Sequence, residues 1–134
     1  MKRLALDWAL ADMRSRGVGA IVAIGDLTAT GTAAQADEVL AALAATGLPL
    51  CSTPGNAEWR TDTTGAVAAR FALPPADGLP LVLLDSAKGT PDDAELARLA
   101  ALPDGAGFLL ATHVPPASWQ AHAQALLDFE AFHK

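Results

Sequence analysis

Hydrophobic residues recur along this chain with two different spacings, one typical of helices and the other of strands. Residues 3–16 place apolar side chains at helical intervals, which predicts an amphipathic helix. Its apolar face would carry Leu4, Trp8 and Ala11. The run AIVAI at residues 20–24 is short and wholly apolar, which predicts a strand buried on both faces. The chain is therefore expected to open with a helix followed by a strand of a covered sheet.

The same two spacings continue along the rest of the chain. Thr32 and Gln35 have the spacing of a helix-capping pair, and the helical stripe after them ends at Gly47. Thr90 and Pro91 predict a second helix start. Strands are predicted at 48–53, 79–86 and 107–113, and helices at 63–71, 90–102 and 118–132. Helices that alternate with buried strands predict the α/β class, with a layered sheet flanked by helices.

Composition and charge narrow the classes of function. A chain of 134 residues is long enough for one core, so residues 1–134 are expected to form a single domain. The net charge is −6 and the nine Lys and Arg residues are scattered, which argues against a nucleic-acid-binding protein. No segment reaches the roughly 20 apolar residues of a membrane span, so we expect a cytoplasmic protein without a membrane partner. Cys51 is the only cysteine, which excludes an internal disulfide and fits a small core side chain.

Polar residues directly follow the four predicted strands. In open α/β sheets, ligand sites gather at the carboxyl ends of the strands. Those ends carry Asp26, Asn56, Asp85 and His113. Carboxylate, amide and imidazole groups are plausible ligands for first-row divalent metals. Each residue also has a purely structural explanation, such as an Asx turn for Asp26, a left-handed position for Asn56 or a strand cap for His113.

Four short motifs resemble those of one enzyme superfamily. They are GDLTATG at 25–31, PGNAEWR at 54–60, LVLLDS at 81–86 and LLATHVPP at 109–116. In this order they resemble the calcineurin-like metallophosphoesterases, in the branch that includes the class III cyclic nucleotide phosphodiesterases. The resemblance implies a fold that is part of the αββα sandwich of that family.

The resemblance also implies roles for individual residues. Asp26 would bridge two divalent ions, Asn56 and His113 would bind the second ion, and Arg60 would contact the substrate. The ions would be Mn, Fe or Zn. Two cations about 3.5–4 Å apart clamp a phosphate group and activate the attacking hydroxide, which is why such sites need a bridging carboxylate.

The chain departs from the family pattern in three ways. It begins at the helix that follows the family's D-x-H strand, so the ligands of the first metal are absent. It stops before the strand that carries the family's G-H-x-H motif, since His122 and His133 belong to the last predicted helix or its end. Ala57 stands where the family has the histidine that assists the leaving group, while Glu58 keeps the acidic character of the next position. We therefore expect a partial phosphoesterase domain with at most one weak metal site.

Two classes of function follow from these residues. The first is a metal-dependent phosphoesterase that hydrolyses a phosphomonoester or phosphodiester small molecule, with activity impaired or absent in the isolated chain. The alternative is a non-catalytic remnant or interaction module on the same scaffold. A dehalogenase-type phosphatase is disfavoured because Thr28 replaces its second acid. A triad of Ser86, Asp85 and His113 is disfavoured because no G-x-S-x-G elbow surrounds the serine.

The strand at 20–24 also bears on assembly. In the family, the missing first strand lies beside it in the interior of the sheet. The AIVAI run carries no lysine, proline or other feature that protects an exposed sheet edge from pairing with another strand. We therefore expect a partner at this edge, either a second copy of the chain in a homo-oligomer or a separate chain that completes the domain.

Overall fold

The computed structural model describes residues 2–105 and 107–115 of the chain, and it confirms the α/β class. Helices and strands follow one another in the predicted order, and the helix predicted at 118–132 lies outside the described residues. The elements are α1 (Lys2–Ser15), β1 (Ile21–Ile24), α2 (Ala33–Ala44), β2 (Leu50–Thr53), the 3-10 helix η1 (Asn56–Trp59), α3 (Ala66–Ala69), β3 (Leu81–Leu84), α4 (Asp93–Ala100) and β4 (Leu109–Thr112).

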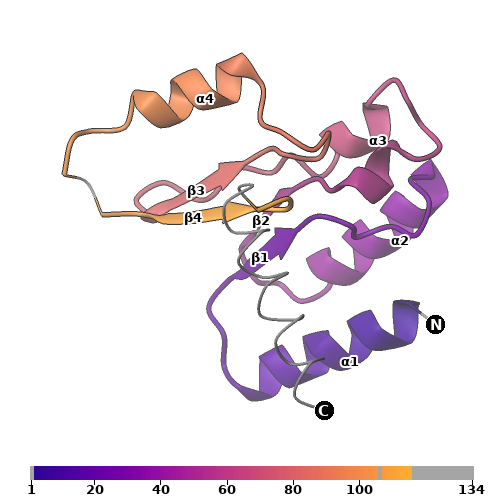
Figure 1. Cartoon of the computed structure of the whole chain (residues 1–134). Coiled ribbons are helices and arrows are strands. Elements are labelled where there is room, and N and C mark those ends of the chain that lie inside the picture. Colours follow the sequence, from indigo (N-terminus) through magenta and orange to yellow (C-terminus); the bar gives the residue numbers. More distant parts are fainter. Residues whose placement is uncertain (1, 106, 116–134) are drawn as a thin grey trace, which may run out of the picture.

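The four strands form two parallel pairs. β1 pairs with β2, with Ile21 opposite Leu50, and β3 pairs with β4, with Leu81 opposite Leu109. In Figure 1, α1 and α2 lie on the side of the β1–β2 pair, and α4 lies beyond the β3–β4 pair. The two pairs therefore lie between helices at opposite ends of the molecule.

Small apolar clusters join these elements. Leu10 of α1, Ile21 of β1 and Leu43 of α2 pack together on one side of the first strand pair. Cys51 of β2 packs with Leu83 and Ala111 of the second pair. Cys51 is only 4% exposed, which confirms that it serves as a core side chain. The cores of the two strand pairs thus meet at β2.

The predicted apolar face of the first helix is wrong. Leu4 is 79% exposed, Trp8 is 73% exposed, and Ala11 is also exposed. The helix instead packs through Leu10, with Leu6 and Met13 partly buried against the same cluster. Both faces of the helix have helical spacing, the predicted one at residues 4, 8 and 11 and the observed one at residues 6, 10 and 13. Periodicity alone therefore does not distinguish between them. Contact with the sheet and α2 makes the choice.

The prediction that the first strand is buried on both faces is also wrong. Ile21 and Ala23 are buried, whereas Val22 is 41% exposed and Ile24 is 44% exposed. Within the part of the chain that the structure describes, β1 pairs only with β2. The strand therefore has one covered face, and a partner chain at its other edge stays a prediction.

The helix caps match the sequence in one case and differ in the other. The Thr32 hydroxyl accepts the backbone N–H of Gln35 at the start of α2, as predicted. The cap of α4 is Asp92, whose carboxylate accepts the backbone N–H of Glu95 at 2.9 Å. Thr90 lies too early to fill that role, because the capping oxygen must reach an amide two or three residues further on. None of the described helices has the length and apolar character needed to cross a membrane.

Candidate functional site

Three of the residues predicted at strand ends come together at one point. Asp26 follows β1, Asn56 opens η1 just after β2, and His113 follows β4. His113 Nε2 lies 3.0 Å from Asn56 Oδ1 and 3.4 Å from Asp26 Oδ1. Parallel strands present their carboxyl ends on the same side, so three distant segments of the chain meet at one cluster of side chains.

The orientation of the His113 ring is set by the backbone of β1. His113 Nδ1 lies 3.2 Å from the carbonyl oxygen of Ile24. A carbonyl can only accept a hydrogen bond, so the ring bonds to Ile24 in the tautomer that carries its hydrogen on Nδ1. In that tautomer the lone pair of Nε2 faces the oxygens of Asn56 and Asp26, whereas in the other tautomer Nε2 donates its hydrogen to them.

This donor set fits a cation. An unprotonated ring nitrogen, an amide oxygen and a carboxylate oxygen are all acceptors, and they repel one another unless a positive charge lies among them. Neighbouring atoms bound to one metal ion at about 2.0–2.1 Å are themselves about 2.8–3.4 Å apart in octahedral or tetrahedral geometry. The separations around His113 Nε2 lie in that range. A hydrogen on Nε2 or a metal ion would therefore satisfy the cluster.

Asp26 occupies a left-handed backbone conformation. Its φ is +53°, the one positive value among the non-glycine residues that the structure describes. Such a conformation is costly for most side chains and tolerated best by Asn and Asp. The Asp26 carboxylate is held by the backbone N–H of Ala57, which donates to Oδ1 at 2.8 Å. Asp26 is thus a turn residue, and the turn aims its carboxylate at His113.

Glu58 has a structural role that was not predicted from the sequence. Its side chain is fully buried, and its two carboxylate oxygens accept four hydrogen bonds. Oε2 accepts the backbone N–H groups of Gly55 at 2.7 Å and Asp26 at 3.0 Å. Oε1 accepts the backbone N–H and the hydroxyl of Thr28, both at 2.8 Å. One carboxylate therefore ties the loop after β1 to the loop after β2.

A local signal for part of this role was present in the sequence. Gly55 and Glu58 are three residues apart, which is the spacing at which an acid reaches back to the first amide of a helical turn. No local pattern in the sequence indicates the bonds from Glu58 to Asp26 and Thr28, because those residues lie about thirty positions away.

Two glycines allow the strand ends to approach each other. A Cβ on Gly55 would lie 2.3 Å from the backbone nitrogen of Asp26 and 2.6 Å from its Oδ1. A Cβ on Gly25 would lie 2.5 Å from His113 Nδ1. Any side chain at either position would push these groups apart.

The remaining predicted site residues lie around this cluster. Ala57 is fully buried, and its contribution is the backbone N–H to Asp26. Arg60 is exposed and donates to the carbonyl oxygen of Ala29 at 3.0 Å, so it braces the loop after β1. Asp85 accepts the backbone N–H of Ala87 at 2.9 Å and lines a separate cavity. Over residues 2–105 and 107–115, no group of three or more His, Cys, Asp or Glu side chains is placed to hold a metal, and the cluster at His113 includes the Asn56 amide as its third group.

None of the protein-family models, curated proteins or solved structures compared with this chain matches it.

Proposed function

We propose that this chain is a metallophosphoesterase-like domain that binds one divalent metal ion weakly through Asp26, Asn56 and His113. The observation that carries the proposal is the convergence of the His113 ring nitrogen Nε2 with the Asn56 and Asp26 oxygens, while Nδ1 of the ring faces the Ile24 carbonyl. The four motifs in family order support the same conclusion. Helices at both ends of the two strand pairs are compatible with part of a layered αββα domain.

Each ligand would make a different contribution to binding the ion. Asp26 supplies the negative charge, and the bond from Ala57 keeps its carboxylate aimed at His113. His113 supplies a ring nitrogen whose direction is set by the contact of Nδ1 with the Ile24 carbonyl, the kind of outer contact that orients metal-binding histidines. A bound divalent ion would polarise a phosphate oxygen and lower the pKa of a coordinated water.

The reaction that fits this donor set is hydrolysis of a phosphate ester, at a low rate in the isolated chain. A phosphoester hydrolase also has to protonate its leaving group. The methyl side chain of Ala57 cannot donate a proton, and the Glu58 carboxylate is occupied by four hydrogen bonds. This same observation favours the second candidate, a metal-binding module without catalysis on the phosphoesterase scaffold.

Metal binding tests the proposal directly. Calorimetric titration with MnCl₂ or ZnCl₂ should give one weak site, and Asp26→Asn should abolish it. Asparagine keeps an acceptor for Ala57 and tolerates the left-handed backbone, so this variant removes the charge while retaining the turn. Asp77→Asn, in an exposed loop, is the matched control and should bind as the unmodified chain does. Two tight sites, or no binding at all, would contradict the proposed single weak site.

Turnover distinguishes the two candidates. With added manganese, the chain is expected to hydrolyse bis-(p-nitrophenyl) phosphate barely above background. Turnover that is robust, sensitive to EDTA and lost in Asp26→Asn would establish the enzyme. Metal binding without turnover would support the non-catalytic module.

A further inference from the structure

A cavity of about 290 Å³ opens between the two strand pairs, and none of the Asp26, Asn56 and His113 side chains lines it. Its origin lies in the pairing of β2. Leu73 forms an antiparallel bridge to Ser52, with N–H···O distances of 2.9 and 3.0 Å in the two directions. The Leu73 segment therefore occupies part of the β2 edge that faces β3. The two strand pairs stay apart there, and the space between them is the cavity.

One wall of the cavity is polar and comes from β3 and α4. Arg98 donates from Nη2 to Glu95 Oε2 at 2.7 Å and also to the backbone carbonyl oxygen of Leu83. Glu95 Oε2 accepts the backbone N–H of Asp85 at 3.1 Å as well. The guanidinium is thus paired with one carboxylate and fixed to a strand carbonyl, which leaves it poorly suited to hold an anion.

Asp85 adds a second carboxylate to this wall. Its Oδ1 accepts the backbone N–H of Ala87, whereas no group in the described part of the chain bonds to its Oδ2. The charges of Glu95 and Arg98 cancel, so the Asp85 carboxylate gives this wall a net charge of −1. The residue is partly buried, where a charge is less well solvated than at an open surface.

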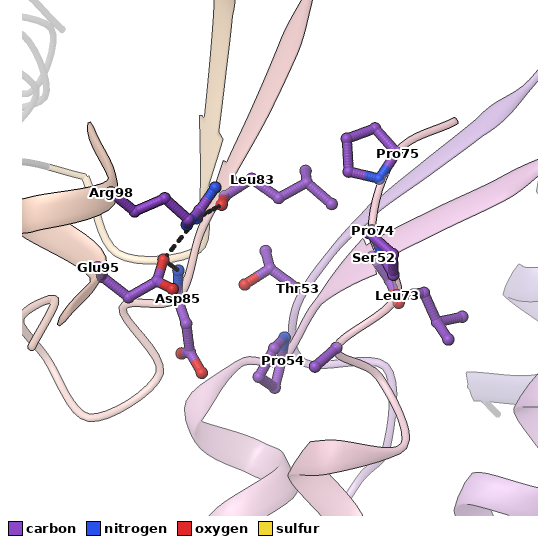
Figure 2. Close-up of a pocket in the computed structure, with 11 residues that line it drawn as sticks. Ser52, Thr53, Pro54, Leu73, Pro74, Pro75, Leu83, Asp85, Glu95 and Arg98 are labelled. Carbon is purple, nitrogen blue, oxygen red and sulfur yellow. Dashed lines mark hydrogen bonds and ion pairs between the residues drawn. The ribbon is translucent and has the colours of Figure 1, made fainter. Parts of the chain in front are cut away.

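The opposite wall is apolar. Figure 2 shows Leu73, Pro74 and Pro75 on the side of the cavity away from Arg98 and Glu95, with Thr53 between the two walls. The two pyrrolidine rings beside the Leu73 segment form a surface that can cover a hydrocarbon group and donate no side-chain hydrogen bonds to it. A ligand would therefore meet a net negative wall on one side and an apolar wall on the other.

We propose that this cavity binds a small organic ammonium compound, with the cationic nitrogen at Asp85 and an apolar body against Leu73, Pro74 and Pro75. The volume of about 290 Å³ lies just below the range of common ligand cavities, which begins at about 300 Å³, and suits a small ligand with one ring. The net charge of −6 on the chain favours the approach of a cation. This site is independent of the proposed metal site and needs no catalysis.

Benzylammonium chloride is the probe, and benzyl alcohol is its neutral counterpart of similar shape. In ¹H–¹⁵N spectra of the full chain, the ammonium compound should shift the backbone amides of Thr53, Leu73 and Asp85 in a saturable way. Benzyl alcohol should bind at least about tenfold more weakly, since a charge-assisted hydrogen bond accounts for a factor of that size. Asp85→Asn should weaken binding of the ammonium compound by a similar factor, because the asparagine amide still accepts the N–H of Ala87 but carries no charge.

Asp77→Asn serves again as the control, because its carboxylate is exposed and does not line the cavity. It should leave the affinity for benzylammonium unchanged. The proposal is overturned if both compounds bind equally, if Asp85→Asn binds as tightly as the control, or if saturating shifts appear away from the cavity. Absence of any saturable shift would overturn it as well.

Discussion

The buried carboxylate of Glu58 accepts the backbone N–H of Asp26 at 3.0 Å. Glu58 thereby holds in place the residue that supplies the carboxylate of the candidate site. Asp26 has a left-handed backbone, and its carboxylate is fixed separately by Ala57. The turn after β1 is therefore held at both its backbone and its side chain. A strained conformation of this kind persists only where the surroundings determine it, and such positions cluster at functional sites.

Replacement of Glu58 should destabilise the whole chain. In Glu58→Gln the new NH₂ group would face N–H donors, so two of the four bonds would lose their acceptor. Each unsatisfied buried group costs about 1–3 kcal/mol, so two of them predict a loss of about 2–6 kcal/mol in the free energy of unfolding. Urea denaturation followed by tryptophan fluorescence measures this loss. Asp77→Asn is the control and should change stability by less than about 0.5 kcal/mol.

Gly55→Ala should separate the two strand ends. The backbone φ of Gly55 is −111°, which alanine adopts readily, so the expected cost arises from the contacts of the new Cβ with Asp26 and the Gly25 backbone. Overpacking of this kind costs about 1–3 kcal/mol. Gly19→Ala is the matched control, because a Cβ there meets nothing within 4 Å, and it should be neutral or slightly stabilising. Equal stability of the two variants would contradict the close approach.

A pair of substitutions in α1 tests which face of the helix is buried. Leu10 is 6% exposed, so Leu10→Ala should cost about 2–5 kcal/mol of unfolding free energy. Trp8 is 73% exposed, so Trp8→Ala should cost less than about 1 kcal/mol although it removes a larger side chain. Both losses are measured by urea denaturation followed by circular dichroism. A greater cost for Trp8 would mean that the face predicted from periodicity is the buried one.

Stability should decline at high pH because of Cys51. Burial raises the pKa of the Cys51 thiol above its ordinary value of 9.0. The unfolded chain then loses the thiol proton at a lower pH than the folded chain, so the contribution is fully present below pH 9.0 and falls as the pH rises above it. The unfolding free energies of the unmodified chain and of Cys51→Ala are measured at pH 7.5 and at pH 10. The difference between the two chains should be smaller at pH 10. A difference that does not change with pH would contradict this prediction.

The edge of β1 is expected to support self-association. Val22 and Ile24 are more than two-fifths exposed, and β1 has a single partner strand among the described residues. We expect sedimentation velocity over about a hundredfold range of concentration to show self-association, and Val22→Lys with Ile24→Lys to suppress it. A monomer at all concentrations, with the amides of 21–24 protected from exchange, would contradict an open edge.

The sequence by itself determined the elements and the identity of the three residues that meet. Strand and helix signals are local, so short apolar runs and the Thr32 cap located β1 and α2 within a few residues. Asp26, Asn56 and His113 could be selected together because each follows a predicted strand, and parallel strands share one carboxyl end.

Only the tertiary structure decided how those elements face one another. The choice of Leu10 over Trp8 in α1 depends on contact with β1 and α2, since both helix faces satisfy the same periodicity. The bonds from Glu58 to Asp26 and Thr28 join positions about thirty residues apart, and no local pattern records such a pairing. The cavity beside Asp85 exists because Leu73 pairs with Ser52, a contact between segments brought together by folding. Local spacing constrains backbone conformation, whereas burial and long-range hydrogen bonds are settled only when the segments pack.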